Sequence, residues 1–305
     1  MTAAAMRPSL REPLAVWAIL AAVALATLAT YDRIDPGDLW NVSGDGIAAG
    51  LGRALVDLNF PAAFVAIAIV LVVEERVRLP VLAGVAIALC AVTAVPGVVR
   101  QSDLDARWIN ALPALGVAVA AGMTVAALLR GGLGRRSGST WVDAVRLVLA
   151  AVLLAVAVPW IAAALGFHVN GPYLSSKVIP EAGHPHLAAV HLGLHHGLDG
   201  TVLALSALVL SRVTGQLAAG ARRTVLAIYL SVMLVYGLAN VANDAWDEQV
   251  VKRGWAHSLM PGVTTPSFNG AWLGVILAAA ALSAVVLYRL GRAAPDAPPP
   301  ARVPV

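Results

Sequence analysis

Charged residues are scarce in this chain of 305 residues, because Asp, Glu, Lys and Arg together make up only 12% of it. Soluble domains carry about 25% charged residues and about 45–50% apolar ones. Apolar side chains reach 59% here. These proportions exclude a soluble globular domain and predict a chain that crosses a lipid bilayer several times.

Cysteine is almost absent, since the single one, Cys90, lies inside an apolar run. A lone cysteine excludes a disulfide framework, and it excludes zinc and iron–sulfur sites built from several cysteines. The net charge of +4 is small, and the basic residues stand in short clusters beside apolar runs, as topology signals do. We therefore expect no nucleic-acid partner.

Apolar runs long enough for a bilayer crossing, about 20 residues each, predict several transmembrane helices. Their expected ranges are 13–30, 47–73, 79–99, 109–129, 143–166, 187–211, 223–243 and 270–290. The predicted fold is all-α, a polytopic transmembrane helix bundle of about eight spans, with residues 1–292 in a single transmembrane domain. The first run could instead be a cleaved signal peptide, but its length of about 18 residues exceeds the usual apolar segment of about 7–15.

The basic residues predict the orientation of this bundle. Most of the 21 Lys and Arg residues lie beside the two termini or in the loops on the same side, and such loops face the cytoplasm. We therefore expect both termini in the cytoplasm and the protein in the plasma membrane, with the lipid bilayer as its first partner. Segment 293–305 is rich in proline, which predicts a disordered cytoplasmic tail.

Histidine is concentrated around the start of the sixth expected helix, on the outer side of the membrane. His191, His195 and Asp199 follow one another every four residues, so on a helix they form one stripe that runs about 12 Å into the bilayer. Two imidazoles at this spacing can bind one metal ion. Ionisable side chains inside a span are costly and usually serve a function. His186, in the preceding loop, is a further candidate ligand.

A second polar stripe occupies the end of the seventh expected helix, where Tyr236, Asn240, Asp244 and Glu248 recur every four residues. Short loops make consecutive helices antiparallel neighbours, so the two stripes are expected to face each other. Three glycines of the sixth helix would let the backbones approach closely. These glycines are Gly193, Gly197 and Gly200.

The two stripes predict an integral membrane metalloprotein with an outward-facing site on the extracytoplasmic side. The candidate ligands to zinc, copper or iron are His186, His191, His195, Asp199 and Asp244. If the protein is an enzyme, the ion would act on a lipid-borne substrate, with Asp247 or Glu248 as the general base. The chain has no serine or cysteine nucleophile motif, which disfavours covalent acyl transfer.

Other interpretations stay open at this point. The histidines could be solvated in loops or hydrogen-bonded between helices, or they could bind haem. A transporter or channel could have a pathway lined by Asp57, Asp199, Asn240 and Asp244, although Arg53 stands four residues before Asp57 and can pair with it. The bundle could also be a structural or assembly subunit that docks on other membrane subunits.

Two short motifs resemble parts of known families. Residues 191–196 (His-x3-His-His) are similar to one histidine box of the membrane di-iron desaturases and hydroxylases, which need several boxes on the cytoplasmic face. Residues 243–247 resemble the first aspartate motif of the intramembrane UbiA-type prenyltransferases, in which a further acid follows where this chain has Val251. Neither match includes the remaining motifs of its family, so the sequence assigns the chain to no family.

Overall fold

The structure is a computed structural model, and it describes residues 7–31, 46–95, 98, 105–134, 138–164, 196–251, 254–257, 263 and 269–292. Within these ranges it contains helices and no strand. The α-helices are α1 (Arg11–Tyr31), α2 (Gly46–Val77), α3 (Pro80–Ala91), α4 (Ala111–Gly131), α5 (Trp141–Ala164), α6 (His196–Thr214), α7 (Ala221–Trp246) and α8 (Gly270–Arg292). The short turns are η2 (Val92–Ala94), η3 (Trp108–Asn110) and the π-helical η4 (Asp247–Val251). The predicted helical bundle is confirmed, while the expected tail 293–305 lies outside the described residues.

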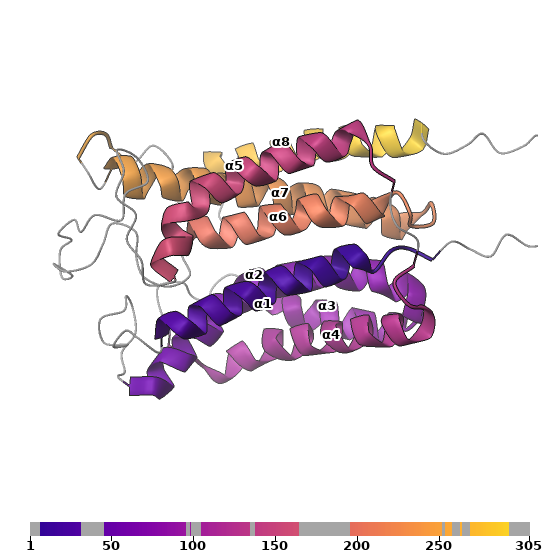
Figure 1. Ribbon diagram of the computed structural model, residues 1–305, viewed down its shortest axis with the longest axis horizontal. Helices are drawn as coiled ribbons and strands as arrows, with labels where there is room; N and C mark the ends of the chain where they lie inside the picture. Colours follow the sequence, from indigo (N-terminus) through magenta and orange to yellow (C-terminus); the bar gives the residue numbers. More distant parts are fainter. Residues whose placement is uncertain are drawn as a thin grey trace, which may run out of the picture.

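The helices run up and down in two layers, with α1–α4 in one and α5–α8 in the other (Figure 1). Each helix runs antiparallel to the one before it, so α1 begins and α8 ends at the same end of the bundle. We call this end, which carries Arg11 and Arg292, the basic end. The opposite end, where α6 begins and α7 ends, carries Asp199, Asp244 and Glu248, and we call it the acidic end.

The interior of the bundle is built on α2, α6 and α7. Most residues in the apolar parts of α2 and α6 are buried, whereas most of those in α5 and α8 are not. Leu203 and Leu210 of α6, Leu226 of α7 and Ile69 of α2 are completely buried in one apolar core. This core joins the two layers through the middle of the molecule.

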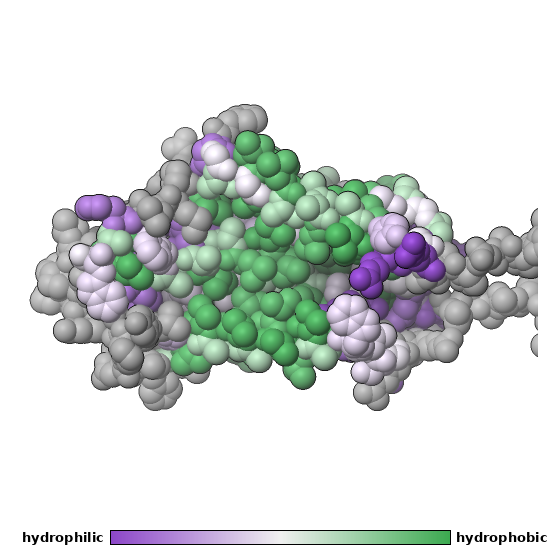
Figure 2. Space-filling model, turned by 90° about the horizontal axis from the view of Figure 1, so that it is seen from above, coloured by the Kyte–Doolittle hydropathy of each residue, from purple (hydrophilic) through white to green (hydrophobic). Residues whose placement is uncertain are grey.

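The surface of the bundle is apolar where a lipid bilayer would surround it. Apolar side chains cover the middle of the bundle, and hydrophilic residues gather toward its ends (Figure 2). Val81 of α3, Leu147 of α5 and Ile276 of α8 are all more than half exposed, an arrangement that lipid tails can solvate and water cannot. Among the described residues, seven helices are long and apolar enough to cross a membrane. The protein is therefore a membrane protein.

The third helix is shorter than the predicted span 79–99. Helix α3 ends at Ala91 and continues only as η2 to Ala94, a length of about 24 Å against about 30 Å of hydrocarbon. Pro96 explains the early end, because the residue before a proline is driven out of the helical conformation. Val95 is indeed extended, with φ −78° and ψ 117°.

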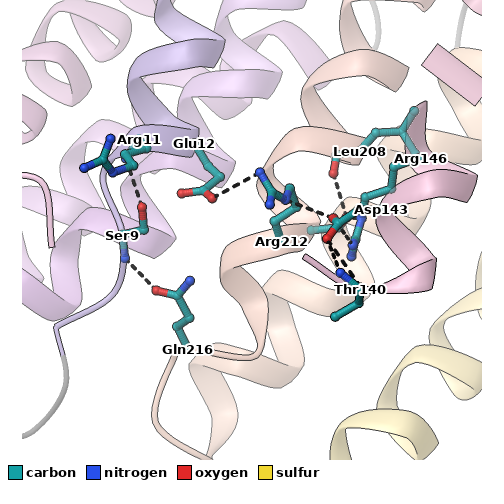
Figure 3. Close-up of polar contacts among 10 residues, drawn as sticks. Ser9, Arg11, Glu12, Thr140, Asp143, Arg146, Leu208, Arg212 and Gln216 are labelled. Atoms are coloured by element: carbon teal, nitrogen blue, oxygen red, sulfur yellow. Dashed lines mark hydrogen bonds and ion pairs between the residues drawn. The ribbon is translucent and has the colours of Figure 1, made fainter. Parts of the chain in front are cut away.

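Ion pairs hold helices together at the basic end (Figure 3). Asp143 of α5 binds Arg146 at 2.9 Å and Arg212 of α6 at 3.0 Å. Arg212 also lies 3.8 Å from the buried carboxylate of Glu12 in α1. One carboxylate thus neutralises two guanidinium groups, and Arg212 connects the two layers.

A second ion pair joins the layers at the same end. Arg222 of α7 pairs with Glu74 and lies 3.6 Å from Glu75, both in α2. The backbone N–H of Ala218, in the turn before α7, donates to Glu75 at 3.1 Å. The basic end is therefore fastened between α2 and α7 as well as between α1 and α6.

Candidate functional site at the acidic end

Helices α6 and α7 touch through their backbones, which brings Asp199 of the first polar stripe to the helix that carries the second. A Cβ atom placed on Gly200 would lie 2.5 Å from the carbonyl oxygen of Gly237, and one placed on Gly237 would lie 2.6 Å from that of Gly200. Real Cβ atoms do not approach so closely, so only glycine fits at both positions. The expectation that glycines of the sixth helix permit close approach is confirmed for Gly200.

Asp244 of α7 binds the start of α6 directly. Its Oδ2 accepts the backbone N–H of Gly197 at 2.8 Å, and its side chain is almost wholly buried. Asp244 therefore holds the first described turn of α6 against α7, which confirms that the two helices meet at this end, while His191 and His195 of the first stripe lie outside the described residues.

Glu248, one turn further along the chain, is held by α5. Its Oε2 accepts the indole N–H of Trp160 at 3.1 Å, and both side chains are only 1% exposed. Trp160 therefore lies inside the bundle, unlike a tryptophan of an interfacial belt, which lies at the membrane surface. A buried indole requires an acceptor, and no sequence pattern indicated that Glu248 would be this acceptor.

The chain stays helical beyond α7, which brings further polar side chains to the same place. In η4, Asp247 is partly exposed, and its Oδ2 accepts the side-chain amide of Asn243 at 3.1 Å. Gln249, which the sequence reading did not single out, follows Glu248 directly in the chain and is also buried. Single π-helical turns occur often at functional sites. Three carboxylates, those of Asp244, Asp247 and Glu248, thus lie within five consecutive residues of one continuous helix.

Asp199 adds a fourth carboxylate from the first described turn of α6. It interacts electrostatically with the phenol of Tyr236 in α7. The Tyr236 ring lies 5.2 Å from that of Trp272 in α8 and 6.2 Å from that of Phe60 in α2. The backbone oxygen of Tyr236 accepts the Asn240 amide at 2.8 Å. On α7 this aromatic cluster lies about two helical turns before Asp244, toward the middle of the bundle.

Three of the five candidate metal ligands, His186, His191 and His195, lie outside the described residues. The other two, Asp199 and Asp244, lie at the contact between α6 and α7. Within the described part of the chain, no group of three or more His, Cys, Asp or Glu side chains is arranged to hold a metal ion. The metal site therefore stays a prediction.

Arg53 and Asp57, near the start of α2, form the ion pair that their four-residue spacing predicts. The Nε of Arg53 lies 3.1 Å from Oδ2 of Asp57, and both side chains are more than nine-tenths buried. Each charge neutralises the other, which makes their burial affordable in a membrane. This ion pair explains why two ionisable residues occur in an otherwise apolar helix.

No protein-family model, no curated protein and no solved structure matches the chain. The residues themselves therefore carry the functional argument.

Proposed function

We propose that this membrane protein binds one divalent metal ion at the acidic end of α6 and α7. His191 and His195 would supply imidazole ligands, Asp199 and Asp244 carboxylate ligands, and His186 a further imidazole. The observation that carries the proposal is the hydrogen bond between Asp244 and the N–H of Gly197. It fixes an α7 carboxylate beside the start of α6, two residues after His195.

The chemistry of these side chains suits zinc, copper or iron. Neutral imidazole and carboxylate groups are common ligands of all three ions. Outer contacts that fix the orientation of a ligand are typical of metal sites, and the N–H of Gly197 holds Asp244 in this way. Four carboxylates gathered at one end of the bundle also create a negative field that attracts a cation.

An enzymatic role would use a lipid-borne substrate. A metal ion held by three or four protein ligands can activate water or polarise a carbonyl or phosphoryl group. Of the two candidate bases, the contacts favour Asp247, which is partly exposed. Glu248 is buried and held by Trp160, so it suits an anchoring role instead. We propose further that the acidic end faces the extracytoplasmic side of the plasma membrane, since arginines gather at the other end.

The contacts favour a fixed site over a transport pathway. Asp57, an expected lining residue of such a pathway, pairs with Arg53. Asn240 donates to the backbone of its own helix, and Asp244 binds the start of α6. Side chains that already bind other groups of the protein in this way do not favour a water-filled passage lined by them.

The proposal is tested by the zinc affinity of purified variants, measured in competition with a chromogenic chelator. Replacing both His191 and His195 by alanine should abolish tight binding. Asp244→Asn keeps an oxygen that accepts the Gly197 N–H, so it should fold normally and bind zinc about tenfold or more weakly. His184→Ala, a loop histidine outside the proposed set, is the matched control and should bind like the parent. Equal affinity in all four proteins would contradict the proposal.

A further inference from the structure

Three arginines gather beside the loops that follow α2 and α4 at the basic end. Arg7 donates to the backbone oxygen of Arg130 at 2.8 Å. Arg76 donates to the oxygens of Pro8 at 3.1 Å and Gly132 at 2.8 Å. Arg130 donates to the oxygen of Val77. These backbone contacts hold all three guanidinium groups in fixed positions, although Arg7 and Arg130 are exposed.

The guanidinium groups of Arg7 and Arg76 are close neighbours. A Cβ atom on Gly131 would collide with both of them, so they converge on one point above this glycine. Arg7 and Arg76 repel each other. A nearby like charge disfavours the charged form of each group and a nearby opposite charge favours it, so an anion bound here would stabilise both guanidinium groups.

Within the described part of the chain, that charge does not come from a carboxylate. Arg7, Arg76 and Arg130 contact backbone oxygens only. At the same end, the carboxylates of Asp143, Glu12, Glu74 and Glu75 bind Arg212 and Arg222 instead. The carboxyl ends of α2 and α4 offer only about half a negative charge each, which three full positive charges exceed.

We propose that Arg7, Arg76 and Arg130 form a binding site for the phosphate of an anionic lipid headgroup. Each guanidinium has five N–H groups and uses only one or two on the backbone, so N–H groups remain for phosphate oxygens. Arginine suits phosphate because its planar fork can bind two oxygens at once.

The surroundings of the arginines favour a lipid over a free phosphate ion. Leu129, in the last turn of α4, is 82% exposed, and Leu133 and Leu79 in the two neighbouring loops are also exposed. These leucines place apolar surface next to the charged groups. Acyl chains can cover the leucines while the headgroup phosphate binds the arginines, whereas a free ion would leave the leucines uncovered.

The test is native mass spectrometry of the full-length protein, delipidated in a non-ionic detergent and titrated with phosphatidylglycerol or with phosphatidylcholine. The parent should retain one phosphatidylglycerol about tenfold more tightly than phosphatidylcholine. The double variant Arg76→Gln with Arg130→Gln should lose this preference. Arg7→Gln removes an exposed side chain with one described hydrogen bond, so it should stay folded and lose part of the preference.

The matched control is Arg289→Gln with Arg292→Gln, which removes two charges from α8 at the same end. These arginines lie over the rings of Trp141 and Tyr288, away from the proposed site. This control should keep the preference of the parent. An equal loss in the control would show general surface electrostatics and overturn the proposal. Inorganic phosphate bound at the three arginines as tightly as phosphatidylglycerol would replace the lipid site by an ion site.

Discussion

Arg78 is the residue at which α2 turns toward α3, and its backbone shows why the position is sensitive. Its φ is +54°, in the left-handed region that glycine adopts freely and other residues avoid. Its N–H donates to the oxygen of Glu74 at 2.8 Å and closes the end of α2.

Replacing Arg78 should therefore separate backbone strain from side-chain loss. We expect Arg78→Gly to unfold at the same temperature as the parent or above it, because glycine removes the strain. Arg78→Val should be about 1–2 kcal/mol less stable than Arg78→Gly, since a β-branched residue is least tolerated at positive φ. Thermal unfolding in detergent measures both variants. Equal stability of the two would show that the turn relaxes.

Trp160 is a buried residue whose indole N–H donates to the carboxylate of Glu248. Trp160→Phe removes the N–H that Glu248 accepts and leaves a buried carboxylate oxygen without that donor. The expected cost is about 1–3 kcal/mol of folding free energy. Trp108→Phe is the control, because Trp108 is 79% exposed. If both variants unfolded at the same temperature, the hydrogen bond to Glu248 would contribute nothing measurable.

Among the elements, α6 and α7 form the closest pair, and glycine is the reason. The spacing of Gly193, Gly197 and Gly200 predicted a thin face on the sixth helix, and the structure places Gly200 against Gly237. Sequence could not identify Gly237 as the partner, because only the register between two helices decides which residues meet.

Gly200→Ala should force these two helices apart. The new methyl group would lie 2.5 Å from a backbone oxygen, which cannot rotate away, so we expect a loss of about 1–3 kcal/mol. The matched control is Gly122→Ala in α4, where a Cβ meets nothing within 4 Å. That change should stabilise the helix by about 0.5–1 kcal/mol. Thermal unfolding of the two variants in opposite directions is the expected result, and two equal shifts would contradict it.

The polar residues of the elements show where sequence reasoning succeeds. Arg53 and Asp57 stand one helical turn apart, so periodicity alone predicts their pairing, and the structure confirms it. Glu12, Asp143 and Arg212 come from three different helices. Their network depends on tertiary packing, which no local pattern in the sequence specifies.

At the scale of the whole molecule, composition predicted the bundle, and the apolar runs predicted the ends of most described helices to within about four residues. Apolar content decides this because lipid demands helices whose backbone groups are all satisfied internally. The start of the sixth expected helix lies outside the described residues. The short α3 escaped prediction because the apolar run continues past Pro96 while the helix ends before it. The histidine part of the candidate site lies outside the described residues.

Cysteine labelling in intact cells tests the orientation of the bundle in the membrane. Cys90 is buried, so it should give little background. A cysteine introduced at position 178 should react with a membrane-impermeant reagent from outside, while cysteines at 138 and 294 should react only after lysis. Reaction of 138 or 294 in intact cells would contradict a cytoplasmic basic end.

The most direct measurement of the central claim is the metal content of the parent protein. The full-length chain is purified without chelator, supplied in turn with zinc, copper and iron, passed through a desalting column and subjected to elemental analysis. The proposed site predicts about one equivalent of at least one of these ions per chain, since structural and catalytic sites retain their ion through such handling. Retention of none of the three at stoichiometric level would contradict a metal site at the acidic end.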